Sequence, residues 1–155
     1  RGMFGRQKAI DLDASCMVFD INRNLIDQVW FRQPKSRDGS VRHTGDNRTG
    51  KGDGDDESIV VDLTSVSSDA QTLMFVVNSF TGQSFSKIEN ASCRLVDLDA
   101  NIEIARYDLT GSGSHTAQIM AKVSRYGSGW AMTAIGERCS GRTFIDLLPA
   151  SLPFL

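Results

Sequence analysis

The sequence predicts an all-β protein, an antiparallel β-sandwich with a short C-terminal helix. Three observations support this fold class. Segments with alternating apolar and polar residues recur along the chain, Asp, Asn, Gly and Ser separate them, and only the last residues space apolar side chains as a helix does. About seven to nine such short segments with turns between them are typical of a β-sandwich.

The clearest predicted strand covers residues 10–20, where apolar residues alternate with Asp11, Asp13 and Ser15 at its start. Because successive side chains of a strand point to opposite faces, we expect Asp11 and Asp13 on the same face. The next predicted strands are 28–32, 58–63, 72–79, 90–97 and 102–108, and Asp38 with Gly39 indicates a tight turn between two of them.

The C-terminal part predicts a closing hairpin followed by a helix. Residues 117–124 alternate in polarity, Gly127 and Gly129 follow, and residues 130–135 form the returning strand. Residues 142–148 show a short helical pattern of apolar side chains, and we expect Pro149 to end that helix.

Length and charge indicate a single domain, residues 1–155, with one core. The net charge of -2 argues against overall attraction to nucleic acid or to an anionic membrane. No apolar run approaches the roughly 20 residues that cross a bilayer, so we expect a cytoplasmic protein with reduced thiols.

The three cysteines are too widely spaced for a zinc site or a disulfide scaffold. Cys16 and Cys93 lie on alternating strands, where a free cysteine behaves as a small buried apolar residue. Cys139 is the one that we expect to be exposed.

Residues 45–57 depart from the strand pattern, because they carry five carboxylates and four glycines but only two basic side chains. Ca²⁺ binds about six to eight oxygen atoms, and glycines let a loop curl around an ion. Arg48, Gly50 and Lys51 stand where an EF-hand loop needs acids and then glycine, which excludes that motif. A solvated acidic loop is the alternative, but the mutual repulsion of five carboxylates favours a bound cation.

Several motifs, in order along the chain, resemble the TerD family of tellurium-resistance and stress proteins, in particular its TerZ/TerX branch. They are DLDAS at 11–15, VWFR at 29–32, HTGDNRTGKGDGDDE at 43–57, VNSF at 77–80 and IARYDL at 104–109. The resemblance runs from about residue 9 to residue 148. The family begins with a further strand containing a Gly-Leu-Gly-Trp-Asp-like stretch that nothing here matches, so we expect the N-terminal strand to be missing.

The resemblance implies a calcium-binding β-sandwich with two adjacent Ca²⁺ ions. By position, the metal ligands correspond to the Asp-Leu-Asp pair and to the acidic loop: Asp11, Asp13, Asp46, Asn47, Asp53, Asp55, Asp56 and Glu57. The resemblance further implies a non-enzymatic module of a stress-response system against tellurite, phage and colicins. Its expected partners are other stress-resistance proteins in a membrane-associated complex, without nucleic acid. The protein would then lie in the cytoplasm, peripheral to the inner membrane through partners and not by direct insertion.

Two alternatives from other classes stay open, a metal-dependent hydrolase and a cyclic-nucleotide or anion-binding protein. The hydrolase would use the same carboxylates, but neither His43 nor His115 lies in a recognisable triad or metal-ligand spacing. Residues 110–115 have the glycines and hydroxyls of an anion-binding loop but lack the P-loop lysine. The sequence therefore favours a cation-binding module without catalysis.

Overall fold

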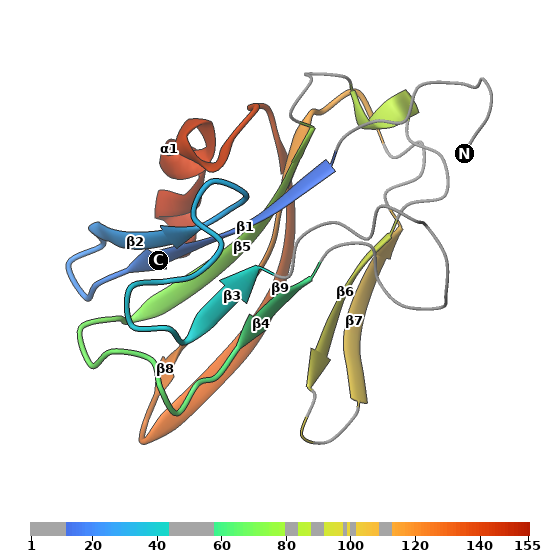
Figure 1. Cartoon of the computed structure of the whole chain (residues 1–155). Helices are drawn as coiled ribbons and strands as arrows, with labels where there is room; N and C mark the ends of the chain where they lie inside the picture. Colours follow the sequence, from blue (N-terminus) through green and yellow to red (C-terminus); the bar gives the residue numbers. More distant parts are fainter. Residues whose placement is uncertain are drawn as a thin grey trace.

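The computed structural model describes residues 12–43, 58–79, 84–87, 92–97, 99, 102–108 and 113–155, and it confirms the predicted fold class (Figure 1). The described strands are β1 (Leu12–Phe19), β2 (Leu25–Val29), β3 (Val41–His43), β4 (Ile59–Val61), β5 (Thr72–Ser79), β6 (Ser92–Asp97), β7 (Ile102–Asp108), β8 (Ala117–Tyr126) and β9 (Gly129–Cys139). Short helices are η1 (Phe85–Lys87), η2 (Phe144–Leu147), α1 (Leu148–Ser151) and η3 (Leu152–Phe154). None of the helices in these ranges is long and apolar enough to cross a membrane.

The described strands form one five-stranded sheet, in the order β2-β1-β5-β8-β9, and two two-stranded sheets, β3-β4 and β6-β7. Every pairing is antiparallel. Strands β1 and β5 are interior strands of this sheet, and β5 and the second half of β1 are mostly buried, which explains their apolar sequences.

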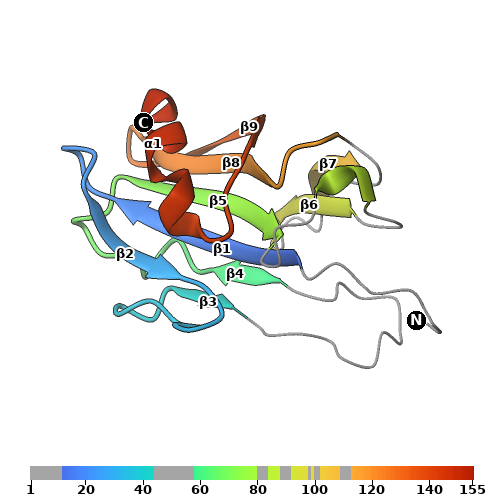
Figure 2. The ribbon, with the colours of Figure 1, turned by 90° about the horizontal axis from the view of Figure 1, so that it is seen from above.

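The C-terminal segment and the β3-β4 hairpin cover opposite faces of the five-stranded sheet (Figure 2). On one face, Phe144 and Leu147 of η2 pack against Met17 of β1 and Met74 of β5. On the other face, Val41 of β3 joins a second apolar cluster. That cluster consists of Cys16, Val18, Val29, Val41, Ala70 and Leu73. The five-stranded sheet therefore lies between the C-terminal segment and the β3-β4 hairpin, a layered arrangement as predicted.

Two strand predictions were wrong in detail, and local hydrogen bonds explain both. The predicted strand 28–32 lies earlier, as β2, because the backbone groups of Trp30 and Gln33 bond to each other at 3.0 Å and close a turn. Strand β3 was missed because three residues are too few to show an alternating pattern, although its burial does alternate. Gly39, with a φ of 78°, lies in the predicted turn at Asp38 and Gly39, which the structure places between β2 and β3.

The closing hairpin of β8 and β9 is confirmed, although β9 runs to Cys139 and is longer than the predicted strand 130–135. Tyr126 pairs with Gly129, so Gly127 and Ser128 form a two-residue loop. Gly127 has a φ of 58°, the value that the first central residue of a type II′ turn needs. The glycine therefore has a conformational role here.

The expectation that Pro149 ends a helix was wrong. Pro149 stands in the first turn of α1, whose N-cap is Leu147. A proline fits there because the first N–H groups of a helix have no partner within the helix, so its missing N–H costs nothing. The predicted helical segment 142–148 begins instead as the 3₁₀ helix η2.

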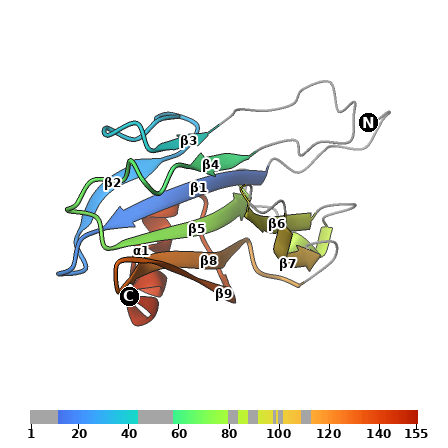
Figure 3. The ribbon, with the colours of Figure 1, turned by 90° about the horizontal axis from the view of Figure 1, so that it is seen from below.

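Four strand ends lie together at one end of the molecule (Figure 3). Strand β1 begins there and β5 ends there, since Leu12 pairs with Ser79. Strand β3 ends and β4 begins there, since His43 pairs with Ile59 and β4 packs against β1. The residues between β3 and β4 include the acidic segment, so both of its anchors lie close to the start of β1.

Candidate metal centre

Asp13 is the only predicted metal ligand among the residues that the structure describes. It lies half-buried near the start of β1. The other predicted ligands lie outside the described residues: Asp11, Asp46, Asn47, Asp53, Asp55, Asp56 and Glu57. What the structure tests is therefore the surroundings of Asp13.

Asp13 pairs directly with Asn78 of β5. Side chains opposite each other in an antiparallel pair lie on the same face, with Cβ atoms about 4.5–5.5 Å apart. The carboxylate and the amide therefore stand side by side. Sequence reasoning did not single out Asn78 as a ligand, although a polar amide in the otherwise apolar strand β5 is a signal that could have found it.

The amide of Asn78 has a fixed orientation and a free oxygen. Its Nδ2 donates hydrogen bonds to the backbone oxygens of Gly141 at 3.2 Å and Thr143 at 3.3 Å. Because both partners are acceptors, the nitrogen must face them, and the amide cannot be flipped. Oδ1, on a residue that is 1% exposed, accepts no hydrogen bond from the part of the chain that the structure describes.

A buried amide oxygen without a hydrogen bond costs about 1–3 kcal/mol. The neighbouring Asp13 is also an oxygen-bearing side chain, and an ionised carboxylate accepts hydrogen bonds but cannot donate one to Oδ1. Carboxylate and amide oxygens are the ligands that Ca²⁺ prefers. The residues at this position therefore fit a calcium ion, and the ion would satisfy the buried oxygen.

His43 lies at the boundary of the acidic segment, where it is buried on β3. Its backbone N–H donates to the carbonyl oxygen of Pro34 at 2.7 Å, and this bond ties the end of β3 to the chain after β2. The side chain of His43 is buried, so a substrate would have little access to it.

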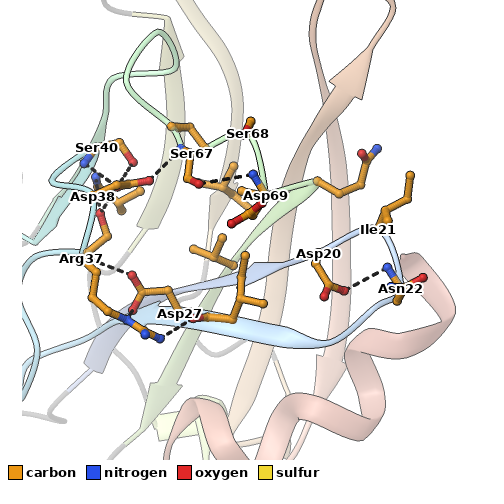
Figure 4. Close-up of a pocket in the computed structure, with 18 residues that line it drawn as sticks. Asp20, Ile21, Asn22, Asp27, Arg37, Asp38, Ser40, Ser67, Ser68 and Asp69 are labelled. Atoms are coloured by element: carbon orange, nitrogen blue, oxygen red, sulfur yellow. Dashed lines mark hydrogen bonds and ion pairs between the residues drawn. The ribbon is translucent and has the colours of Figure 1, made fainter.

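A groove lies at the other end of β1 (Figure 4). Its volume is about 850 Å³, and Asp20, Asp27, Asp38 and Asp69 line it together with Arg37. Despite these carboxylates, the described residues contain no group of three or more His, Cys, Asp or Glu side chains that could hold a metal ion. Asp20 follows Asp13 by seven residues of extended chain, about 20 Å, so the groove is separate from the candidate metal centre.

Two of the groove carboxylates, Asp27 and Asp38, have several structural partners. Asp27 accepts hydrogen bonds from the backbone N–H of Arg37 at 2.8 Å and from the side-chain amide of Gln33 at 2.9 Å. Asp38 accepts bonds from Ser36, Ser40 and the backbone N–H of Ser67. These bonds hold the loops around the sheet together and leave the groove without a free anionic cluster for a cation.

The electrostatics of Asp38 follow from these contacts. Burial by itself would raise the pKa of its carboxyl group, but hydrogen bonds from Ser40, Ser67 and Ser36 outweigh it and lower the pKa to about 2. The carboxylate is therefore ionised at neutral pH and accepts hydrogen bonds from two segments, its own turn at residues 36–40 and the loop that contains Ser67.

Cys16 is fully buried, which confirms the prediction that it belongs to the core. Burial, with a further contribution from the charge of Asp27, raises the pKa of its thiol far above the ordinary value. Cys139 is half-buried against the C-terminal segment, so the expected exposure is only partial, although Cys139 is more exposed than Cys16. Burial raises the pKa of the Cys139 thiol to about 11, so neither thiol is a reactive thiolate. The side chain of Cys93 lies outside the described residues.

His115 is buried against the ring of Phe85, with ring centroids 4.6 Å apart. Burial and the charge of Arg138 lower the pKa of His115, although a hydrogen bond with Gln118 opposes this shift. The imidazole is neutral at pH 7 and packs as part of the structure.

The sheet order and the Asp13–Asn78 pair near the start of β1 describe a β-sandwich with a candidate cation site. The TerD domain matches residues 3–147, and the chain belongs to the TerD family. It is 48% identical to the tellurium resistance protein TerZ of Serratia marcescens, over 94% of this chain and 75% of that protein. It is 39% identical to TerX of the same organism, over 79% of this chain and 60% of that protein.

Other relatives carry stress-response names. The chain is 38% identical to the stress response protein SCP2 of Bacillus subtilis, over 90% of this chain and 73% of that protein. A solved structure of a homologue of the telluride resistance protein TerD from Streptomyces coelicolor has the same fold. Its TM-score is 0.78 at 18% identity, with 93% of this chain and 87% of that chain covered. The chain therefore belongs to a family of tellurium-resistance and stress-response proteins.

Proposed function

We propose that this protein is a calcium-binding module of a tellurite stress response that works without catalysis. The proposal rests on the register pairing of Asp13 with Asn78, whose buried Oδ1 accepts no hydrogen bond from the described residues, at the end of the sheet where β3 ends and β4 begins. A cation bound there would neutralise the segment's carboxylates and satisfy the amide oxygen. The acids of the segment, with Asp11 and Asp13, are numerous enough to surround two Ca²⁺ ions.

The direct test is a comparison of thermal unfolding in calcium and in a chelator. Binding to the folded state alone stabilises a protein by about 2.7 kcal/mol at a hundredfold excess over Kd. We expect calcium to raise the melting temperature, and magnesium to replace it poorly because Mg²⁺ demands tight octahedral geometry. Identical curves in calcium and chelator would end the metal proposal.

Charge-removing variants localise the site. The double variant Asp55→Asn and Glu57→Gln keeps the shape of the side chains but removes two charges, so calcium affinity should collapse while the apo protein still folds. Asp69→Asn removes a charge from the groove at the far end of β1 and is the matched control. Equal small effects of the two changes, measured by calorimetric titration, would mean that the acidic segment is only solvated.

The absence of catalysis is tested separately. Full coordination by protein oxygens leaves no open position for an activated water, which Lewis-acid hydrolysis needs. Calcium-loaded protein should therefore show no turnover of phosphate mono- and diesters, cyclic nucleotides included. A calcium-dependent rate that both His43→Ala and Asp55→Asn abolish would move the protein into the hydrolase class.

The partners in this proposal are other stress-resistance proteins, and the protein lies in the cytoplasm at the inner membrane through them. Cell fractionation tests this location. The protein should sediment with membranes only when those partners are present, and salt should release it, because no insertion is involved.

A further inference from the structure

Asn78 is a polar contact between β1 and the chain after β9, two regions that also meet through the packing of Met17 against η2. Through β-sheet pairing it adjoins Asp13, and through its Nδ2 it binds the backbone oxygens of Gly141 and Thr143. These two residues begin the C-terminal segment, residues 141–155, which runs through η2, α1 and η3. One side chain thus connects the candidate metal centre to the start of this segment.

The C-terminal segment is held to the sheet at several points. Phe144 and Leu147 are buried in the core cluster on that face. The backbone N–H of Gly141 donates to the Thr116 hydroxyl at 3.0 Å. At the far end, Lys122 Nζ donates to the carbonyl oxygen of Phe154 at 2.6 Å. Because Met17 lies four residues after Asp13 on the same strand, Phe144, Leu147 and Asn78 all contact the face of the sheet on which Asp13 lies, but only Asn78 pairs directly with Asp13.

We propose that Asn78 is a positioning residue that couples a cation bound at Asp13 to the docking of the C-terminal segment, so that each stabilises the other. The inference rests on the proposed function, since it requires a cation at Asp13. It goes further by assigning that cation a regulatory role. Calcium would strengthen the cover over one apolar face of the sheet, and loss of calcium would loosen it.

The physical link is the rigid, polarisable amide group. A cation in contact with Oδ1 fixes the rotamer of Asn78 and therefore places Nδ2 toward Gly141 and Thr143. The cation also draws electron density toward the oxygen, which makes the N–H groups stronger donors. Conversely, a docked segment holds Oδ1 ready for the cation. Coupling of this kind is reciprocal, so calcium affinity and segment docking must change by the same factor.

Amide hydrogen exchange of the full chain, followed by mass spectrometry, measures this coupling. Peptides covering residues 144–155 should exchange more slowly in calcium than in chelator, by on the order of tenfold, a usual size for coupling between two sites. In Asn78→Ala this calcium dependence should disappear, and calcium affinity should fall by a comparable factor in a calorimetric titration.

Two further variants separate coupling from simple loss of packing. Asn78→Asp keeps an oxygen for the cation but has no N–H donors, so calcium binding should recover relative to Asn78→Ala while the calcium dependence of exchange stays absent. Lys122→Met removes the attachment at the other end of the segment. It should speed exchange in both conditions and leave the calcium factor unchanged.

The outcomes distinguish this inference from the proposed function. Calcium binding to the wild-type chain with the same slowing of exchange in Asn78→Ala or Asn78→Asp would overturn the coupling and leave the calcium module standing. No calcium binding to the wild-type chain would overturn both. If Asn78→Ala fails to fold, the comparison of the wild type with Asn78→Asp decides the inference on the same criterion.

Discussion

Replacing Asp38 by Asn tests whether one carboxylate holds the loops around the groove together. Its Oδ1 accepts bonds from the Ser36 hydroxyl at 2.8 Å and from the Ser40 N–H and hydroxyl at 2.9 and 2.6 Å. Its Oδ2 accepts a bond from the N–H of Ser67 at 2.8 Å. An amide presents one oxygen and one NH₂ group, so at least one set of these donors loses its acceptor.

The size of the effect follows from the pKa of Asp38, which is lowered from 3.8 to about 2 in the folded protein. At about 1.36 kcal/mol per pKa unit, the shift corresponds to about 2.5 kcal/mol. Because the carboxylate is largely exposed, solvent screening reduces this value, and we expect a loss of about 1 kcal/mol at pH 7. A folded pKa below the unfolded value means that this stabilisation is complete above pH 3.8 and disappears as the pH falls through 2.

The assay is urea unfolding of the wild type and Asp38→Asn at pH 7 and at several values below pH 4, all in chelator. The stability difference should be largest at pH 7 and should shrink as the pH approaches 2. Asp69→Asn is the control, since it removes the same charge from the same groove and should leave stability nearly unchanged. A constant difference at every pH, or an equal loss in the control, would refute the reasoning.

Three further predictions concern local features, and urea unfolding measures the change in the free energy of unfolding for each variant. Cys16→Ser should lower the free energy of unfolding by about 1–3 kcal/mol, because it buries a hydroxyl in an apolar cluster, and it should not abolish calcium binding. Loss of calcium binding in that variant would contradict a purely structural role for Cys16. Gly127→Ala should cost about 1 kcal/mol through its positive φ alone, since a Cβ there meets nothing within 4 Å, whereas Gly129→Ala should be nearly neutral. Pro149→Ala should change stability by less than about 1 kcal/mol and add no helical signal in circular dichroism, and a gain in helix would show that the proline does limit it.

Much of the fold was predictable because strand periodicity is a local property. The bounds of β5 and β7 agree with the predicted segments 72–79 and 102–108, and the predicted start and end of β1 differ by two residues or fewer. The two predictions that were wrong also have physical reasons. The shift of β2 depends on a turn closed by Trp30 and Gln33, and the place of Pro149 depends on where η2 gives way to α1. Neither depends on apolar spacing, which was the signal used.

The candidate site likewise has one part that the sequence predicts and another part that only the tertiary structure shows. Composition alone determined that residues 45–57 are anionic and rich in glycine, and linear motifs alone indicated the family, because charge and motif spacing are local properties of the chain. Only the tertiary structure decided that Asn78 stands opposite Asp13 and also binds Gly141 and Thr143. The register of β1 against β5 and the path of the chain after β9 set these neighbours. Such contacts depend on how distant segments pack, and no local pattern in the sequence specifies them.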